Sequence, residues 1–159
     1  MGKGREIAGF FVWVVVVFAA VSIGSFYTSR GLAGWYDHLA KPSFTPPDWV
    51  FGPVWTVLYL MMAAAAWLVW RSAPLKNVTG PLALFAVQLA LNVAWTAIFF
   101  GLMDPGRAFA EIVILWLAIA ATAVLFWQHS RTAALLLVPY WLWVTFASVL
   151  NFAIWRMNR

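Results

Sequence analysis

The sequence predicts an all-α fold: an integral membrane bundle of five transmembrane helices with a long ordered loop between the first and second helices. Of the 159 residues, 65% are hydrophobic and 9% are charged. A soluble domain has about half apolar and about a quarter charged residues. The mean hydropathy is +0.87. The apolar residues gather in five runs of about 20 residues, the length that a helix needs to cross the hydrocarbon core.

The five runs form one domain over residues 1–159. We expect spans at about residues 7–26, 49–70, 81–102, 108–127 and 132–155. The first is uncharged, and its length favours a retained span over a signal-peptide core of about 7–15 residues. Arg71 follows the second span and Arg156 the fifth. Pro81 suits the first position of the third helix, where its missing N–H costs nothing. Glu111 lies one turn after Arg107, and we expect it to be an ion-paired or snorkelling carboxylate at the surface.

The connections differ in length. Residues 103–107 and 128–131 are turns between antiparallel neighbours, whereas residues 27–48 form a 22-residue segment rich in aromatics and prolines. A loop this long in a compact bundle is usually functional, and we expect a lid over one end of the bundle. Orientation stays open, because alternating spans place five Lys and Arg on each side of the membrane.

Polar and aromatic side chains recur at helical spacing in three spans. The residues that share faces are Trp55 and Tyr59; Gln88, Asn92, Thr96 and Phe99; and Tyr140, Trp143, Ala147 and Asn151. Facing one another, they would line a cavity for a large, flat, mostly apolar ligand, to which Asn92 offers one hydrogen bond. The alternative is hydrogen bonding between helices, which we favour for Gln88 and Thr96. For Asn92 with Trp55 and Trp143, both interpretations stay open.

The third span carries a second pattern on its opposite face. Ala86, Ala90 and Ala94 form a ladder of small residues that lets two helices approach closely, and it predicts a homodimer.

Three groups of sequence blocks form a recognisable pattern: Trp35-Tyr36-Asp37-His38-Leu39-Ala40-Lys41-Pro42, Pro46-Pro47, Phe51, Pro53-Val54-Trp55 and Leu58-Tyr59; Gln88 to Asn92 with Trp95 and Phe99-Phe100; and Pro139-Tyr140, Trp143, Phe146-Ala147 and Leu150-Asn151. These blocks resemble the signature of the TspO/MBR family, the tryptophan-rich sensory proteins related to the mitochondrial translocator protein or peripheral benzodiazepine receptor. Together they cover essentially the whole chain, in order.

The resemblance implies a dimeric five-helix bundle that binds porphyrins such as protoporphyrin IX and haem, and benzodiazepine-type ligands, beneath the first loop. It assigns Trp55, Asn92, Trp143 and Ala147 to the pocket, and Tyr36, Pro42, Phe51 and Tyr59 to its mouth. Lys41 and Arg30 could meet porphyrin propionates, with anchoring at the membrane interface as the alternative, which we favour for Arg30. Phe99, Tyr140 and Asn151 complete the expected ligand-binding set. We expect no obligatory cofactor and a bacterial cytoplasmic membrane location.

Function stays open between a tetrapyrrole sensor, scavenger or translocator and a light-dependent porphyrin-degrading enzyme that uses Trp55 and Trp143. No conventional catalytic constellation is visible in the sequence. Without cysteines and with two histidines, a metal centre is not expected. The scattered cations flank apolar runs, which argues against nucleic acid as a partner. Sterol binding is doubtful, because Phe152 stands where the sterol motif needs tyrosine.

Overall fold

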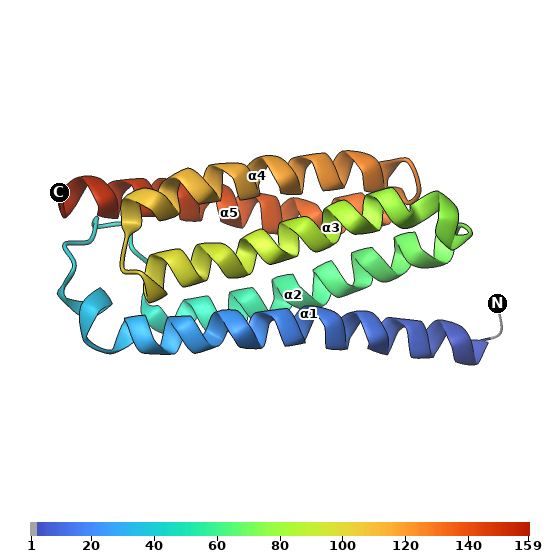
Figure 1. The fold of residues 1–159 in the computed structure, drawn as a ribbon, viewed down its shortest axis with the longest axis horizontal. Coiled ribbons are helices and arrows are strands. Elements are labelled where there is room, and N and C mark those ends of the chain that lie inside the picture. Colours follow the sequence, from blue (N-terminus) through green and yellow to red (C-terminus); the bar gives the residue numbers. More distant parts are fainter. Residues whose placement is uncertain (1–2) are drawn as a thin grey trace.

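The computed structural model describes residues 3–159, which form an all-helical bundle without strands (Figure 1). The long helices are α1 (Lys3–Gly31), α2 (Asp48–Ser72), α3 (Leu75–Thr96), α4 (Pro105–Trp127) and α5 (Arg131–Met157). Two short π-helical segments, η1 (Leu32–Tyr36) and η2 (Ala97–Gly101), continue α1 and α3. Within residues 3–159, five helices are long and apolar enough to span a membrane. The predicted fold class is therefore confirmed.

The chain after the first span is more helical than the sequence suggested. We expected the first helix to end near residue 26 and residues 27–48 to form the loop. Instead α1 runs to Gly31, η1 follows, and only residues 39–47 lie outside helices. In the extension beyond residue 26, the hydroxyls of Thr28 and Ser29 donate to the carbonyls of Gly24 and Phe26 within the helix. Hydroxyl side chains can satisfy helix carbonyls as well as turns, which explains the difference.

The third helix also begins earlier than expected. It starts at Leu75, so Pro81 lies inside the helix and not at its first position. A proline there leaves the carbonyl four residues earlier without its helical partner. That carbonyl belongs to Asn77, which lies on an exposed turn near the helix start. The missing hydrogen bond therefore falls at an exposed position near the start of the helix and not in its buried part.

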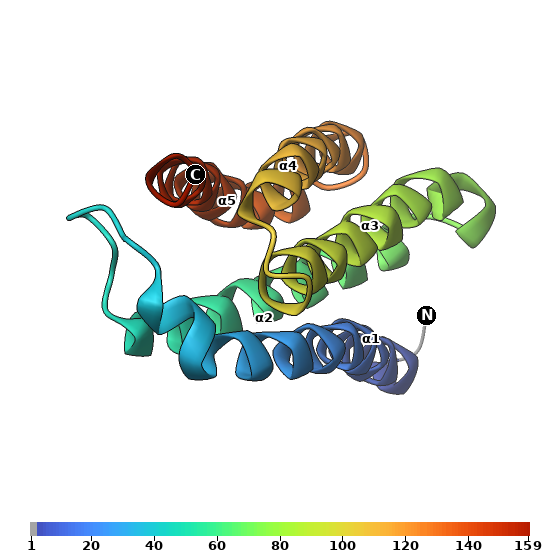
Figure 2. The same cartoon turned by 60° about the vertical axis from the view of Figure 1, so that its left-hand side comes forward.

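The helices pack so that α3 lies between α4 and the α1–α2 pair, while α5 packs on α4 and α2 (Figures 1 and 2). The beginning of α1 and the α2–α3 and α4–α5 turns lie at one end of the bundle. The loop 39–47, the α3–α4 connection and the end of α5 lie at the other (Figure 1). We call these the turn end and the loop end.

The half of the bundle near the turn end is solidly packed. Met62, Ala63, Ala66, Val69 and Phe85 have no exposed surface there. The alanines let α2 approach its neighbours closely, as small residues do in membrane bundles.

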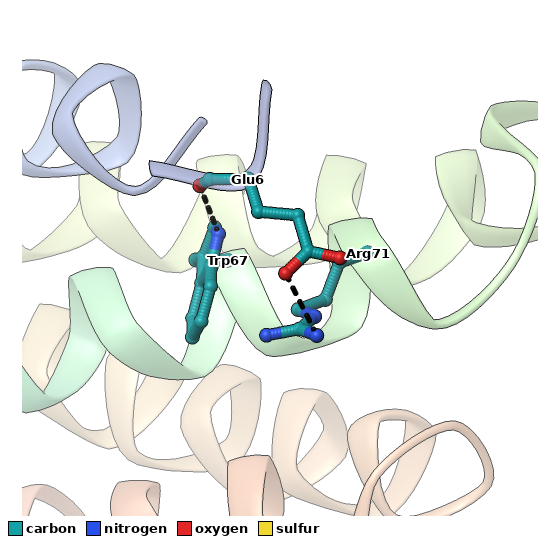
Figure 3. Close-up of polar contacts among 3 residues, drawn as sticks. All are labelled: Glu6, Trp67 and Arg71. Carbon is teal, nitrogen blue, oxygen red and sulfur yellow. Dashed lines mark hydrogen bonds and ion pairs between the residues drawn. The ribbon is translucent and has the colours of Figure 1, made fainter. Parts of the chain in front are cut away.

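Contacts between α1 and α2 fix the start of α1 at the turn end. The Trp67 indole donates to the Glu6 carbonyl at 2.9 Å, and the Arg71 guanidinium lies 3.0 Å from the Glu6 carboxylate (Figure 3). Arg71 also lies over the Trp67 ring, 4.6 Å from its centroid. Gly9 sits against the Trp70 ring with no room for a side chain. The two helices are therefore joined at this end.

Glu111 departs from its expected surface role. Arg107 pairs with Asp104, whose carboxylate also caps the start of α4 by accepting from the Arg107 backbone N–H at 2.9 Å. Glu111 is buried, and neither carboxyl oxygen has a hydrogen-bond partner in the described chain. The helical phase explains this, because Glu111 lies on the same inward face of α4 as Ile112 and Leu115.

Candidate ligand-binding cavity

A cavity of about 510 Å³ lies inside the bundle near the loop end. This volume is within the range of about 300–1,000 Å³ typical of small-molecule sites. Side chains of α1, η1, α2, α3, η2 and α5 line it, and none of its described lining residues comes from α4. The lining residues are Phe18, Val21, Gly24, Ser25, Thr28, Ser29, Leu32, Tyr36, Asp48, Phe51, Gly52, Trp55, Thr56, Tyr59, Trp95, Thr96, Phe99, Phe100, Trp143, Ala147, Leu150, Asn151 and Ile154.

Aromatic rings form much of the wall. Trp55 stacks on Tyr59 with ring centroids 5.2 Å apart, and Trp143 meets Trp55 edge to face at 6.4 Å. On the α3 side, Trp95 stacks on Phe99 at 5.3 Å. Rings from three helices therefore support one another in fixed orientations around the cavity. Such walls suit a flat, apolar ligand.

A chain of buried hydrogen bonds lies behind this wall. The Tyr59 hydroxyl donates to Asn92 Oδ1 at 3.1 Å, and Asn92 Nδ2 donates to the Tyr140 hydroxyl at 3.2 Å. Tyr140 in turn donates to Gln88 Oε1 at 2.9 Å. Asn92 and Tyr140 are buried and do not line the cavity. The structure thus places Asn92 behind Tyr59, where its amide holds two tyrosines.

Asn151 joins three helices at the cavity wall. Its Oδ1 accepts from the Trp95 indole at 3.0 Å, and its Nδ2 donates to the Pro105 carbonyl at 2.7 Å. These bonds orient the Trp95 ring from α5 and tie α5 to the start of α4. The Asn151 side chain therefore positions a wall ring.

Most polar groups of the lining are neutral hydroxyls, which belong to Ser25, Thr28, Ser29, Tyr36, Thr56, Tyr59 and Thr96. Asp48 is the only charged residue among the described lining residues. The lining hydroxyls of Thr28 and Thr56 donate to carbonyls of their own helices, which leaves their oxygens as acceptors. At the end of η1, burial, then Asp48 and Asp37, raises the pKa of Tyr36 to about 12. Tyr36 is therefore a neutral hydroxyl in the lining at ordinary pH.

The structure brings most of the sequence-predicted ligand-binding residues to one cavity. Those that line it are Tyr36, Phe51, Trp55, Tyr59, Phe99, Trp143, Ala147 and Asn151. Lys41 and Pro42 lie in the loop 39–47, and the Lys41 ammonium lies over the Tyr36 ring, 4.4 Å from its centroid. Neither lines the cavity.

Sequence reasoning missed the contribution of α1. Its residues Phe18, Val21, Gly24, Ser25 and Thr28 line the cavity. The recurrence of Val21, Ser25 and Thr28 at spacings of four and three was a usable signal for one helix face. It was hidden because the run is apolar and was interpreted only as a membrane span.

The predicted dimer residues lie on the outer surface of α3. Ala86 and Ala90 are exposed and Ala94 is half-buried. With Val87, also exposed, they form an outward face of small and apolar side chains.

Comparisons with known proteins agree on one family. The family model described as TspO/MBR family matches residues 11–156. The chain is 46% identical to the tryptophan-rich protein TspO of Chlorobaculum tepidum, over 85% of this chain and 86% of that protein. It is 43% identical to the human translocator protein, over 88% of this chain and 86% of that one. It is 44% identical to the tryptophan-rich sensory protein of Cereibacter sphaeroides, over 78% and 77% of the two chains.

Proposed function

This chain belongs to the TspO/MBR family of membrane proteins, and on that premise we propose that it binds a tetrapyrrole, protoporphyrin IX or haem, inside the bundle. In this role it acts as a sensor, scavenger or translocator of porphyrins. The observation that carries the proposal is the cavity of about 510 Å³, walled by the stacked pairs Trp55–Tyr59 and Trp95–Phe99.

The lining favours a metal-free porphyrin over haem. None of the described lining residues is His, Cys or Met; the lining does hold Tyr36 and Tyr59, but the raised pKa of Tyr36 disfavours the phenolate that binds haem iron. Stacking on aromatic rings needs no metal, so protoporphyrin IX retains all of its contacts in this cavity.

Charge indicates how the ligand is oriented. Asp48 would repel a propionate inside the cavity, whereas Lys41, over the Tyr36 ring in the loop, would attract one. Both charges lie at the loop end, so the propionates are expected on the Lys41 side of the cavity, away from Asp48, with the apolar edge of the macrocycle facing Tyr59.

The proposal also covers the membrane location, the oligomeric state and sterol as a further ligand. The protein is an integral membrane protein, and we assign it to a bacterial cytoplasmic membrane. A homodimer forms through the exposed Ala86 and Ala90 face of α3. Sterol stays doubtful as a ligand because position 152 is phenylalanine.

Titration of the purified protein with protoporphyrin IX, read by tryptophan fluorescence quenching, tests the site. Ala147→Phe puts a ring into the cavity and should weaken binding at least tenfold, because it takes the space of the ligand. Ala121→Phe adds the same ring to an exposed position on α4 and serves as the matched control. Equal affinities for the two variants would place the porphyrin outside the cavity and refute the proposal.

A light-dependent porphyrin-degrading enzyme is the second candidate. It is favoured by the placement of Trp55 and Trp143, which both line the cavity with ring centroids 6.4 Å apart. Indole is more easily oxidised than benzene, so Trp→Phe at both positions should retain binding in the dark and abolish porphyrin bleaching in light. Bleaching at the parental rate would leave these residues as wall residues alone.

A further inference from the structure

The loop 39–47 is tied to the end of α5 by one side chain. The Ala40 backbone N–H donates to Asn158 Oδ1 at 2.9 Å, and Asn158 Nδ2 donates to the Ala40 carbonyl at 2.9 Å. Nδ2 also donates to the Ile154 carbonyl at 2.8 Å. The Asn158 amide thus pairs with both backbone groups of Ala40, as a neighbouring strand would. It uses both of its donor hydrogens and its acceptor oxygen.

The α5 side of this connection is firmly held. Trp155, one turn before Asn158, stacks on Phe109 of α4 with ring centroids 5.9 Å apart. Gly106 lies directly against the Trp155 ring, and a side chain there would collide with it. The α4 side of this anchor contributes no described lining residue, whereas Ile154 of α5, whose carbonyl accepts from Asn158, does line the cavity.

The loop side is held more weakly elsewhere. Lys41 lies over the Tyr36 ring at 4.4 Å, and Phe44, half exposed, meets the edge of Phe146 at 6.4 Å. The loop leaves α1 and η1, reaches the end of α5 and returns to α2 (Figures 1 and 2). Tyr36 before the loop and Asp48 after it both line the cavity. A displacement at Ala40 therefore reaches lining residues on both sides of the loop.

We propose that the Asn158–Ala40 pair is a latch that fixes the loop 39–47 and, through it, the flanking lining residues Tyr36 and Asp48 at the loop end of the cavity. Exchange of a ligand with water requires the pair to open. Asn158 is a positioning residue, because it touches the loop and not the cavity. The statement about ligand exchange rests on the proposed function, whereas the control of access to the cavity does not.

Hydrogen exchange at the Ala40 amide tests the contact itself. Asn158→Ala removes the acceptor of this N–H, so its exchange should accelerate by about tenfold, while amides of α3 and α4 keep their rates. Asn158→Leu keeps nearly the size of asparagine and also removes the acceptor, and it provides a second variant if the alanine variant folds poorly. Asn77→Ala, at an exposed asparagine near the turn end, is the matched control.

Access to the cavity is tested without any porphyrin. The chain has no cysteine, so Ala147→Cys creates a single thiol at a lining position. A charged, membrane-impermeant thiol reagent should label it several-fold faster when Asn158→Ala is added, and at an unchanged rate when Asn77→Ala is added. Faster labelling supports the latch even if the parent protein binds no porphyrin, an outcome that overturns only the proposed function.

The association and dissociation rates of porphyrin distinguish loss of the latch from damage to the cavity wall. Loss of a latch raises the association and dissociation rates together, whereas damage to the wall raises dissociation alone. Unchanged labelling overturns the latch, with or without faster exchange at Ala40. A rise in the dissociation rate alone overturns it too.

Discussion

Replacing Asn92 by leucine separates the structural role of the buried hydrogen bonds from ligand binding. Leucine has nearly the size of asparagine, so the change opens no large space. It removes the bonds at 3.1 Å from the Tyr59 hydroxyl and at 3.2 Å to the Tyr140 hydroxyl. Tyr140 keeps Gln88 as its acceptor, whereas the Tyr59 hydroxyl loses its partner.

The expected cost follows from these two bonds. Side-chain hydrogen bonds between membrane helices average about 0.6 kcal/mol and reach about 1.7 kcal/mol. Asn92→Leu should therefore lower the free energy of unfolding by roughly 1–3 kcal/mol. Tyr59→Phe removes one of the bonds and keeps the ring stacked on Trp55, so it should cost about 0.6 kcal/mol. The double variant should cost less than the sum by about the same amount, because both changes break the same bond.

Denaturation in mixed micelles, followed by circular dichroism, measures these free energies. Porphyrin affinity of Asn92→Leu should fall less than tenfold, because Asn92 lies behind Tyr59 and does not line the cavity. Strict additivity of the two stability changes would refute the bond. A larger loss of affinity at unchanged stability would mean that Asn92 contacts the ligand directly, as the sequence alone suggested.

Three further predictions concern the exposed face of α3, Tyr36 in η1 and the buried Glu111 of α4. Ala90→Leu, on the exposed face of α3, should shift the protein towards monomer in mild detergent, whereas Ala121→Leu on α4 should not; an unchanged dimer would place the interface elsewhere. The raised pKa of Tyr36, about 12 against an ordinary 10, stabilises the fold fully below pH 10, and this contribution is lost as pH rises from 10 to 12. Alkaline unfolding of Tyr36→Phe should lack that loss, and an identical pH profile would contradict the burial. Glu111→Gln should keep or raise the thermal stability, because the amide never carries a charge into the bundle, and strong destabilisation would reveal a missing partner of the carboxylate.

Much of the fold could be predicted because the bilayer constrains both the composition and the length of a helix that spans it. The predicted helix boundaries were wrong at two helix ends, because proline and hydroxyl residues occur both inside helices and at their ends. Pro81 was consistent with a helix start, yet the helix begins at Leu75. The first helix was expected to end near residue 26, yet it runs to Gly31, and the hydroxyls of Thr28 and Ser29 bond within it.

The site was predictable where a helix carries mixed polar and aromatic residues at regular spacing. Trp55, Trp143 and Ala147 line the cavity for this reason. Asn92 has the same spacing as Thr96 but a different role, because the position of the Tyr59 and Tyr140 hydroxyls decides where its amide points. Such pairing between helices is set by three-dimensional packing and leaves no mark on one helix pattern.

The solid half of the bundle has a consequence for traffic across the membrane. The cavity opens near the loop end, and fully buried side chains such as Met62, Val69 and Phe85 fill the core towards the turn end. On the proposed function, a ligand would enter and leave this cavity on one side of the membrane, and the packed core offers no path along the bundle axis to the other side. Delivery to the far side would then need a second protein, so the packing of the core favours the proposed sensor and scavenger roles over that of a translocator.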